Sequence, residues 1–455
     1  MGSYVPNTKK EQQEMLHEIG FSSFEEMFSH IPQEVMLKNG LGLPEGLSEQ
    51  AVIGKMEDMA SKDVVFRHIF RGAGAYCHYI PAIVSSVTSK EEFVTAYTPY
   101  QAEISQGILQ SIFEYQTMIC ELTGMDASNA SIYDGASAAA EAIAMCRDRK
   151  RSTAYVSGAA APGVIEVMKT YCFGSNTRLV VVPEKDGVTD SEALEAELKA
   201  DPQAACFYVQ QPNFFGNMED GELLGRIVHE AGSKYIMGCN PLALAVMKTP
   251  AEYGADIAVG EGQPLGMSLA FGGPYLGYMA AAAAMARKLP GRIVGETADD
   301  KGQRAFVLTL QAREQHIRRE KASSNVCSNQ AWCALTASVY MTAMGAEGMA
   351  QAAGQCISKA HYLADVLRKA GLELKYDREF FHEFVTISPE GRCQDSCHIL
   401  RALEQKGILG GLRLSDREML WCATEMNTKA EMDEAALIVR QVLQGECGQK
   451  EVCGS

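Results

Sequence analysis

The sequence has no apolar run long enough to cross a membrane and no excess of positive charge. Its most apolar stretch, Met279–Ala286, is short and rich in alanine, so we expect it to begin a packed helix. The net charge at pH 7 is −16, because 57 Asp and Glu outnumber 41 Lys and Arg. This balance argues against a nucleic-acid partner, since phosphate neutralisation needs clustered Lys and Arg. The segment from Met1 to Met15 lacks the apolar core of a signal peptide, which predicts a cytoplasmic protein without membrane contact.

Short motifs for metals and nucleotides are also missing. The fourteen cysteines form no C-x-x-C pair, and their spacings include those of Cys327 with Cys333, Cys393 with Cys397, and Cys447 with Cys453. We therefore expect no metal site, and reduced thiols that pack as small hydrophobic side chains. A P-loop is absent. The G-x-G within Arg71–Tyr79 has no third glycine in register, so nucleotide binding is not expected.

The rest of the composition is that of a globular chain with several parts. Its 455 residues, 47% hydrophobic and 22% charged, suffice for a large core and suggest two or three domains. Apolar residues at helical spacing, with Ser22 or Ser23 and Ser48 as helix caps, predict a helical N-terminal arm over residues 1–70.

Strands and helices alternate from Thr153 onward. The expected strands are 154–158, 178–183, 205–212 and 234–240, and the expected helices are 164–171, 191–200 and 223–232. This alternation predicts a mostly parallel sheet with helices on both faces, within an α/β domain at residues 71–330. A long helix from Trp332 to Lys369 with one glycine break, then short strands and two more helices, predicts a small α+β domain over residues 331–455.

The stretch from Ala255 to Gly277 is the first candidate site. Its apolar start at Ile257–Val259 is typical of a buried strand, and it continues into two clusters of glycine and proline. A glycine-rich loop after a strand is where α/β folds bind ligands. At its tip stands Gln263, whose amide can donate and accept hydrogen bonds but cannot act as a nucleophilic amine.

The second candidate is the segment Thr95–Gly107, before a helix expected from Ser105 to Leu122. It can be a solvated loop at a helix start. It can also be a binding surface, because tyrosine joins a flat apolar face to a polar tip. The candidate substrate-binding residues are Tyr97, Thr98, Tyr100, Gln101 and Glu103. Further along, the small residues of Gly135–Ser137 begin a helix, and helix N-termini commonly hold anions.

These elements resemble fold-type I of the pyridoxal-phosphate (PLP) enzymes, the aspartate aminotransferase architecture. Four runs make the resemblance more specific: YTPYQAEISQG (97–107), FEYQTMICELTGMDASNAS (113–131), GEGQPLGMSLAFGGPYLG (260–277) and REQHIRREKASSNVCSNQ (313–330). They are similar to runs in subunit 1 of glycine dehydrogenase (decarboxylating), the N-terminal half of the glycine cleavage system P-protein. The similarity extends over essentially the whole chain.

The resemblance implies that this chain holds no PLP covalently. In the sister subunit, the lysine that binds PLP lies about eleven residues before the proline of a GGP motif, and the same offset from Pro274 leads to Gln263. The sister's acid beside the pyridine nitrogen falls near Met237–Asn240, where no carboxylate stands. Subunit 1 often has His-Pro where this chain has Ala161 and Pro162, which argues against a ligand role there.

The resemblance also implies an activity and partners. With its PLP-bearing sister, subunit 2, such a chain decarboxylates glycine and passes the aminomethyl group to the lipoyl arm of H-protein, and it is inactive alone. Two alternatives remain: a PLP enzyme without an internal lysine, whose nearest preceding lysine is Lys248, and a non-catalytic binding protein of this fold. The run REQHIRREK is either a self-paired helix face or a subunit interface, with His316 and Arg318 as the interface candidates.

Overall fold

The computed structural model describes residues 6–37, 40–96, 99–389 and 396–445, and it divides the chain into two compact units. The first unit is Met1–Val65 and the second is Phe66–Ser455, so the second begins within the segment expected to be an arm. A further division at residue 330 stays a prediction. The helix α12 (Ala331–Ala370) contacts elements on both sides of that boundary.

The first unit is built from short helices with polar caps. They are α1 (Lys9–Glu18), α2 (Phe24–Met27) and α3 (Glu49–Ala60). The Thr8 hydroxyl accepts from the Glu11 N–H, and the Glu11 carboxylate accepts from the Thr8 N–H, which completes a capping box. Ser23 and Ser48 cap the next two helices through their hydroxyls, so both are helix caps as predicted.

A seven-stranded sheet forms the centre of the second unit. In spatial order its strands are β2 (Ala127–Ser128), β10 (Gly277–Ala281), β9 (Ile257–Glu261), β8 (Lys234–Cys239), β7 (Ala204–Gln211), β3 (Thr153–Ser157) and β4 (Leu179–Val182). The strands from β9 to β4 are parallel, while β10 runs antiparallel to β9 and β2. The predicted, mostly parallel sheet is therefore confirmed.

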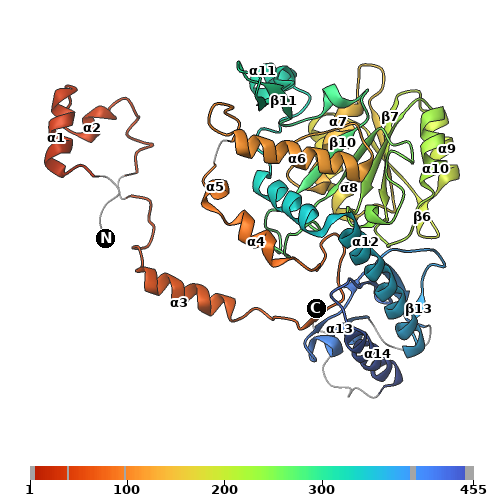
Figure 1. The fold of residues 1–455 in the computed structure, drawn as a ribbon. Coiled ribbons are helices and arrows are strands. Elements are labelled where there is room, and N and C mark those ends of the chain that lie inside the picture. Colours follow the sequence, from red (N-terminus) through yellow and green to blue (C-terminus); the bar gives the residue numbers. More distant parts are fainter. Residues whose placement is uncertain (1–5, 38–39, 97–98, 390–395, 446–455) are drawn as a thin grey trace. The chain divides into compact units, whose positions relative to one another are not determined.

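Helices cover both faces of this sheet (Figure 1). Those on one face are α7 (Gly135–Cys146) and α8 (Pro162–Gly174), and those on the other are α6 (Gln106–Thr123), α9 (Ser191–Ala200), α10 (Gly221–Glu230) and the first half of α12. Successive side chains of a strand point to opposite faces. Phe207 and Val209 accordingly pack with α6 and α10, whereas Cys206 and Tyr208 pack with α7 and α8.

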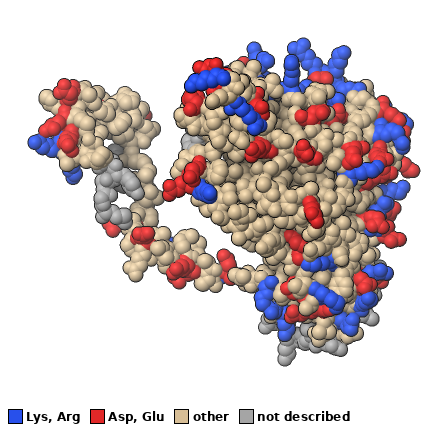
Figure 2. All heavy atoms as spheres, in the orientation of Figure 1, with Lys and Arg blue, Asp and Glu red and all other residues tan. Residues whose placement is uncertain are grey.

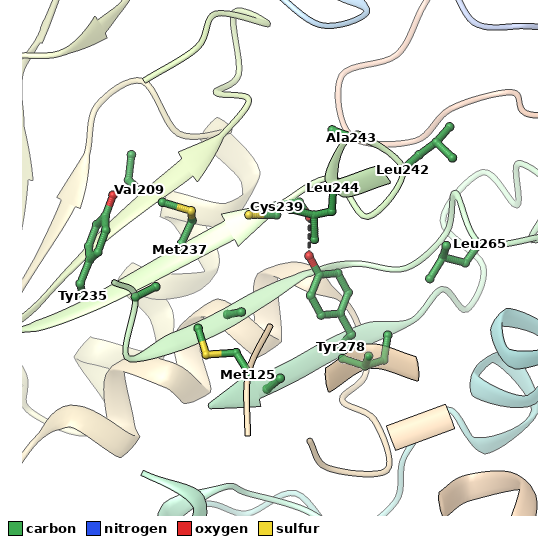
Figure 3. Packing of buried hydrophobic residues seen from close by; sticks show 14 of the residues in the cluster. Met125, Val209, Tyr235, Met237, Cys239, Leu242, Ala243, Leu244, Leu265 and Tyr278 are labelled. Carbon is green, nitrogen blue, oxygen red and sulfur yellow. Dashed lines mark hydrogen bonds between the residues drawn. The ribbon is translucent and has the colours of Figure 1, made fainter. Parts of the chain in front are cut away.

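Glycine makes close packing possible where β8, β9 and β10 meet. The Tyr278 hydroxyl donates to the Cys239 carbonyl at 2.7 Å within the apolar cluster shown in Figure 3. A Cβ at Gly260 would stand 2.3 Å from that carbonyl oxygen and 2.5 Å from the Tyr278 hydroxyl oxygen. At least one glycine of the stretch 255–277 is therefore required by packing, independently of any ligand.

The C-terminal part of the second unit contains the short strands and helices that were predicted, and its strands form an antiparallel sheet. Its strands, in spatial order, are β13 (Glu373–Leu374), β14 (Glu383–Ile387), β17 (Glu418–Cys422) and β16 (Leu412–Arg413). The second half of α12 packs against this sheet together with α13 (Ser396–Glu404) and α14 (Lys429–Gln444). The predicted glycine break in α12 is Gly345, where the helix is kinked at φ 61° and ψ 176°.

Short elements complete the described part of the chain. They are β1 (His68–Ile69) paired with β15 (Ile408–Leu409), β5 (Glu184–Lys185) with β6 (Val188–Thr189), β11 (Val294–Ala298) with β12 (Arg304–Leu308), α4 (Ala82–Thr88), α5 (Glu91–Val94), α11 (Gln315–Arg318), and the 3-10 turns η1 (Ala243–Ala245), η2 (Ala286–Lys288), η3 (Gln311–Arg313) and η4 (Arg319–Lys321).

The prediction of a helix beginning at Met279 is wrong. Met279–Ala281 belong to β10, which is fully buried between β9 and β2 and contacts α6 and α7. Alanine favours helices in isolation, but small side chains also suit a strand pressed by helices on both faces, and here tertiary packing decides.

The buried cysteines and the charged surface are those expected of a globular protein from the composition. Several cysteines are buried thiols in the apolar clusters, as expected, among them Cys146, Cys172, Cys206, Cys239 and Cys333. Within the described ranges, no helix has the length and hydrophobicity needed to span a membrane. Acidic and basic side chains are intermixed along the top, right and bottom of the second unit in Figure 2, and the centre of this face is mostly uncharged.

Candidate functional site

The carboxyl ends of β7, β8 and β9 open into a cavity of about 430 Å³. It is lined by the strand-end residues Gln210, Asn240 and Glu261, the helix starts 134–136 and 161–164, the segment Gly72–Tyr76, and Tyr275 among others. Open α/β sheets bind ligands outside the carboxyl ends of their strands, so this cavity is the candidate site. No Lys, Arg or His among the described residues lines it.

Gln263 lies beside the cavity but its side chain is locked into the protein. It is fully buried, and its Nε2 donates to the carbonyls of Tyr76 at 2.9 Å and Met267 at 2.7 Å. Its Oε1 accepts from the Tyr76 N–H at 2.9 Å. Each of these hydrogen bonds joins the Gln263 side chain to a backbone group. Gln263 therefore fixes the loop after β9 to the cavity wall formed by Gly72–Tyr76.

Two carboxylates occupy the start of α7, where the sequence suggested an anion site. Asp134 Oδ1 accepts from the Ser137 N–H at 2.7 Å, and Glu261 Oε2 accepts from the Gly135 N–H at 3.0 Å. Glu261 Oε1 accepts from the N–H groups of Gln263 and Leu276, each at 3.1 Å. Burial raises the pKa of Glu261 to about 7 despite these donors, and the neighbouring Asp134 adds to the increase.

Glu383 is a second buried carboxyl group, and it forms hydrogen bonds to the cavity wall. Glu383 accepts from the Ala73 N–H at 2.6 Å and from the Tyr76 hydroxyl at 2.7 Å. Burial raises the pKa of Glu383 to about 7, although both donors favour its charged form. The sequence reasoning missed Glu261 and Glu383. The signal for Glu261 was its place at the strand end, two residues before Gln263, whereas Glu383 meets Tyr76 only through folding.

The described candidates of the segment Thr95–Gly107 are not among the residues that line the cavity. Tyr97 and Thr98 lie outside the described residues. Tyr100 is half-buried, and its hydroxyl donates to Asn329 Oδ1 at 2.9 Å. Gln101 and Glu103 are exposed. The expected helix after this loop is confirmed as α6.

The run 313–321 meets the same loop through one buried acid. Glu314, with a side chain 3% exposed, pairs with Arg292, whose guanidinium lies 5.2 Å from the centre of the Tyr100 ring. His316 Nδ1 is 3.6 Å from Glu314 Oε2. Arg318 is exposed, and its Nε donates to the Ala312 carbonyl. The structure thus brings Tyr100 and His316 to one polar cluster, Tyr100–Arg292–Glu314–His316.

Comparisons with known proteins agree over nearly the full length. The profile of the glycine cleavage system P-protein matches residues 2–439. The chain belongs to this family. It is 48% identical to the probable glycine dehydrogenase (decarboxylating) subunit 1 of Brevibacillus brevis, with 94% of this chain and 96% of that one covered. The subunit 1 of Syntrophomonas wolfei is 45% identical, with 98% and 99% covered.

Solved structures show that the chain has the aminotransferase fold, as the sequence indicated. A crystal structure of glycine decarboxylase (P-protein) of the glycine cleavage system, in inhibitor-bound form, has a TM-score of 0.88 and 37% identity, covering 97% of this chain and 100% of that one. The alanine–glyoxylate aminotransferase of Nostoc, at 15% identity and a TM-score of 0.59 over 90% and 100% of the two chains, shows the fold alone.

The cavity does not fit a PLP that is held covalently. Its described lining offers no amine, and Gln263 turns its amide to backbone. At the start of α7, the N–H groups of Gly135 and Ser137 donate to the carboxylates of Glu261 and Asp134, and these acids disfavour a phosphate there. Near the expected position of the pyridine acid stands Asn240, whose Oδ1 accepts from the Leu242 N–H at 2.9 Å. Ala161 and Pro162 line the cavity without a titratable group.

Proposed function

We propose that this chain is the PLP-free subunit of a two-subunit glycine dehydrogenase (decarboxylating), an aminomethyl-transferring enzyme. Subunit 2, its homologue, carries PLP on a lysine. Together they decarboxylate glycine and pass the aminomethyl group to the lipoyl arm of H-protein. The observation that carries the proposal is the buried Gln263 amide, since PLP forms its covalent bond only with an amine.

We further propose that the cluster Tyr100–Arg292–Glu314–His316 faces the sister subunit and shapes its site, with Gln101, Glu103 and Arg318 at the contact. The cluster is incomplete within this chain. Arg292 Nε, Glu314 Oε1 and Asn329 Nδ2 are buried and have no hydrogen-bond partner among the described residues. Unpaired buried polar atoms are costly, so groups from a partner or substrate would stabilise them.

The alternative of a lysine-independent PLP enzyme has little support. Lys248 pairs with Glu222 on the surface, lies over the Tyr253 ring at 5.9 Å, and does not line the cavity. A binding protein without an enzymatic partner would not account for the family's division into numbered subunits.

The experiment is to measure PLP in this chain alone and co-expressed with subunit 2. We expect no bound PLP absorption and no borohydride-fixed adduct on this chain alone, and one adduct, on subunit 2, in the complex. Peptide mapping identifies the modified chain. A stoichiometric reducible adduct on a lysine of this chain would refute the proposal, and so would a complex that turns over glycine without any adduct on subunit 2.

A further inference from the structure

Outside the cavity, three different metal-ligand side chains converge in the interior of the second unit. His78 follows β1, Cys356 lies on α12, and Glu425 follows β17. Their ligand atoms all lie within 4.8 Å of one another. Cys356 is fully buried, and the side chains of His78 and Glu425 are 3% and 10% exposed. Solvated acids often gather without a metal, but this set is buried and chemically mixed.

Two of the three distances inside the cluster come close to those of a zinc site. Nδ1 of His78 lies 2.8 Å from Oε2 of Glu425, and Cys356 Sγ lies 3.2 Å from the same oxygen. Around a tetrahedral zinc ion, with Zn–N of about 2.0 Å, Zn–S of about 2.3 Å and Zn–O of about 2.1 Å, such ligand atoms stand roughly 3.3–3.6 Å apart. Shifts of about 0.5 Å bring these two distances to the zinc values. The third pair, His78 Nδ1 and Cys356 Sγ, lies within 4.8 Å. We propose that His78, Cys356 and Glu425 bind a divalent metal ion of the zinc type.

The surrounding backbone already holds the ligands in place. Glu425 Oε1 accepts from the Tyr79 N–H at 2.7 Å, and the Thr424 hydroxyl donates to the Cys77 carbonyl at 2.6 Å. These contacts fix the two ligand-bearing segments together and leave Glu425 Oε2 for the metal. Lys359, the nearby cation, donates to the Glu425 carbonyl oxygen and not to the carboxylate.

Two histidine rings in this region each have a buried ring nitrogen that makes no hydrogen bond to the described residues. His78 Nε2 and His382 Nδ1 are buried without a hydrogen-bond partner in the described parts of the chain. The two rings are parallel with centroids 6.3 Å apart, and the His78 ring lies 6.1 Å from that of Tyr76, a cavity-lining residue. A bound ion would therefore connect α12 and the segment after β17 to the cavity wall.

Binding is a proton exchange. Cys356 loses its thiol proton to solvent, and its hydrogen bond to Glu425 is replaced by a sulfur–metal bond. The proton between His78 Nδ1 and Glu425 moves to His78 Nε2, so that Nδ1 and the Glu425 carboxylate each donate an electron pair to the ion. For a neutral His78, one proton is released per metal bound, and no oxidant or reductant is required. The sequence did not predict this site, because its ligands come from three distant segments and not from a C-x-x-C pair.

The test uses the untagged full chain, stripped of metal and titrated with Zn²⁺ and then with Co²⁺. We expect one ion per chain and, with Co²⁺, a thiolate-to-cobalt charge-transfer band. Cys356→Ser and Glu425→Gln should each weaken Zn²⁺ binding by more than about 100-fold, beyond the usual loss for an outer hydrogen-bond partner. Cys333→Ser, a buried cysteine on the same helix, is the matched control and should bind Zn²⁺ normally.

Several results would overturn the site. They are no retained Zn²⁺ after gel filtration, bound Co²⁺ without the charge-transfer band, or equal Zn²⁺ binding by wild type and folded Cys356→Ser. A wild type that binds Co²⁺ without this band overturns the site even if the variants unfold, and loss of the band in Cys356→Ser assigns it to Cys356.

Discussion

At the scale of single residues, Gln263 is a structural bridge that replaces a reactive group. Gln263→Leu keeps the volume but leaves the N–H and C=O of Tyr76 and the carbonyl of Met267 without their partner. Each unpaired buried group costs about 1–3 kcal/mol, and the hydrogen bonds to Tyr76 are fully buried whereas that to Met267 is only partly buried. From the two groups of Tyr76 we expect the free energy of unfolding to fall by about 2–6 kcal/mol. Urea denaturation of the purified chain measures it.

The exposed Gln351 on α12 provides the control for this substitution. Gln351→Leu should change the stability by less than about 0.5 kcal/mol. If Gln263→Leu were as mild as this control, the bridge to Tyr76 would not contribute to the stability of the fold.

The buried carboxyl groups give stability a particular dependence on pH. Glu383 has a folded pKa of about 7 against an ordinary value of 4.5. Between these values the folded state keeps a proton that the unfolded state has released, so its contribution is present below pH 4.5 and is lost as the pH rises to about 7. We expect Glu383→Gln to remove up to about 1.4 kcal/mol per pH unit of this decline. Denaturant unfolding from pH 5 to 8 measures the slope.

Glu261 and Glu141, whose burial also raises each pKa to about 7, retain part of the decline in the variant. The exposed Glu230 serves as a control, and Glu230→Gln should leave the pH slope unchanged. Identical slopes for wild type and Glu383→Gln would show that Glu383 is ionised in the folded state throughout this range.

At the scale of elements, the kink of α12 allows one helix to pack on both the large and the small sheet. Gly345 has φ 61° and ψ 176°, a conformation that residues with a Cβ rarely adopt. Gly345→Ala should therefore destabilise by about 1–3 kcal/mol. Gly354→Ala, at an exposed position of the same helix with open space for a Cβ, should instead stabilise by about 0.4–1 kcal/mol. Thermal unfolding measures the change in melting temperature of each variant. Equal changes for the two would show that the backbone at Gly345 is not strained.

Element types were predictable where local pattern and packing agree. The apolar run at Ile257 became β9, and the break in the long C-terminal helix became Gly345. Local pattern failed at Met279, where helix propensity was overridden by burial between two strands. In the candidate site, Gln263 could be singled out from its loop, but its contact with Tyr76 spans 187 residues and exists only in the folded chain.

At the scale of the whole molecule, the proposed heteromer can be tested by charge reversal. Arg318 belongs to the run that meets Tyr100 at Glu314, and its exposed guanidinium is available to the sister subunit. Arg318→Glu places a negative charge where we propose that a cation contributes. It should weaken association with subunit 2 by about tenfold or more, which is about 1.4 kcal/mol. Arg368→Glu, on the exposed face of α12, should change the dissociation constant by less than about twofold.

Sedimentation of the co-expressed subunits over a dilution series gives both dissociation constants, and thermal melting of each variant alone confirms that it is folded. Equal effects of the two substitutions would show that the run 313–321 is a solvated surface of this chain and that the partner binds elsewhere.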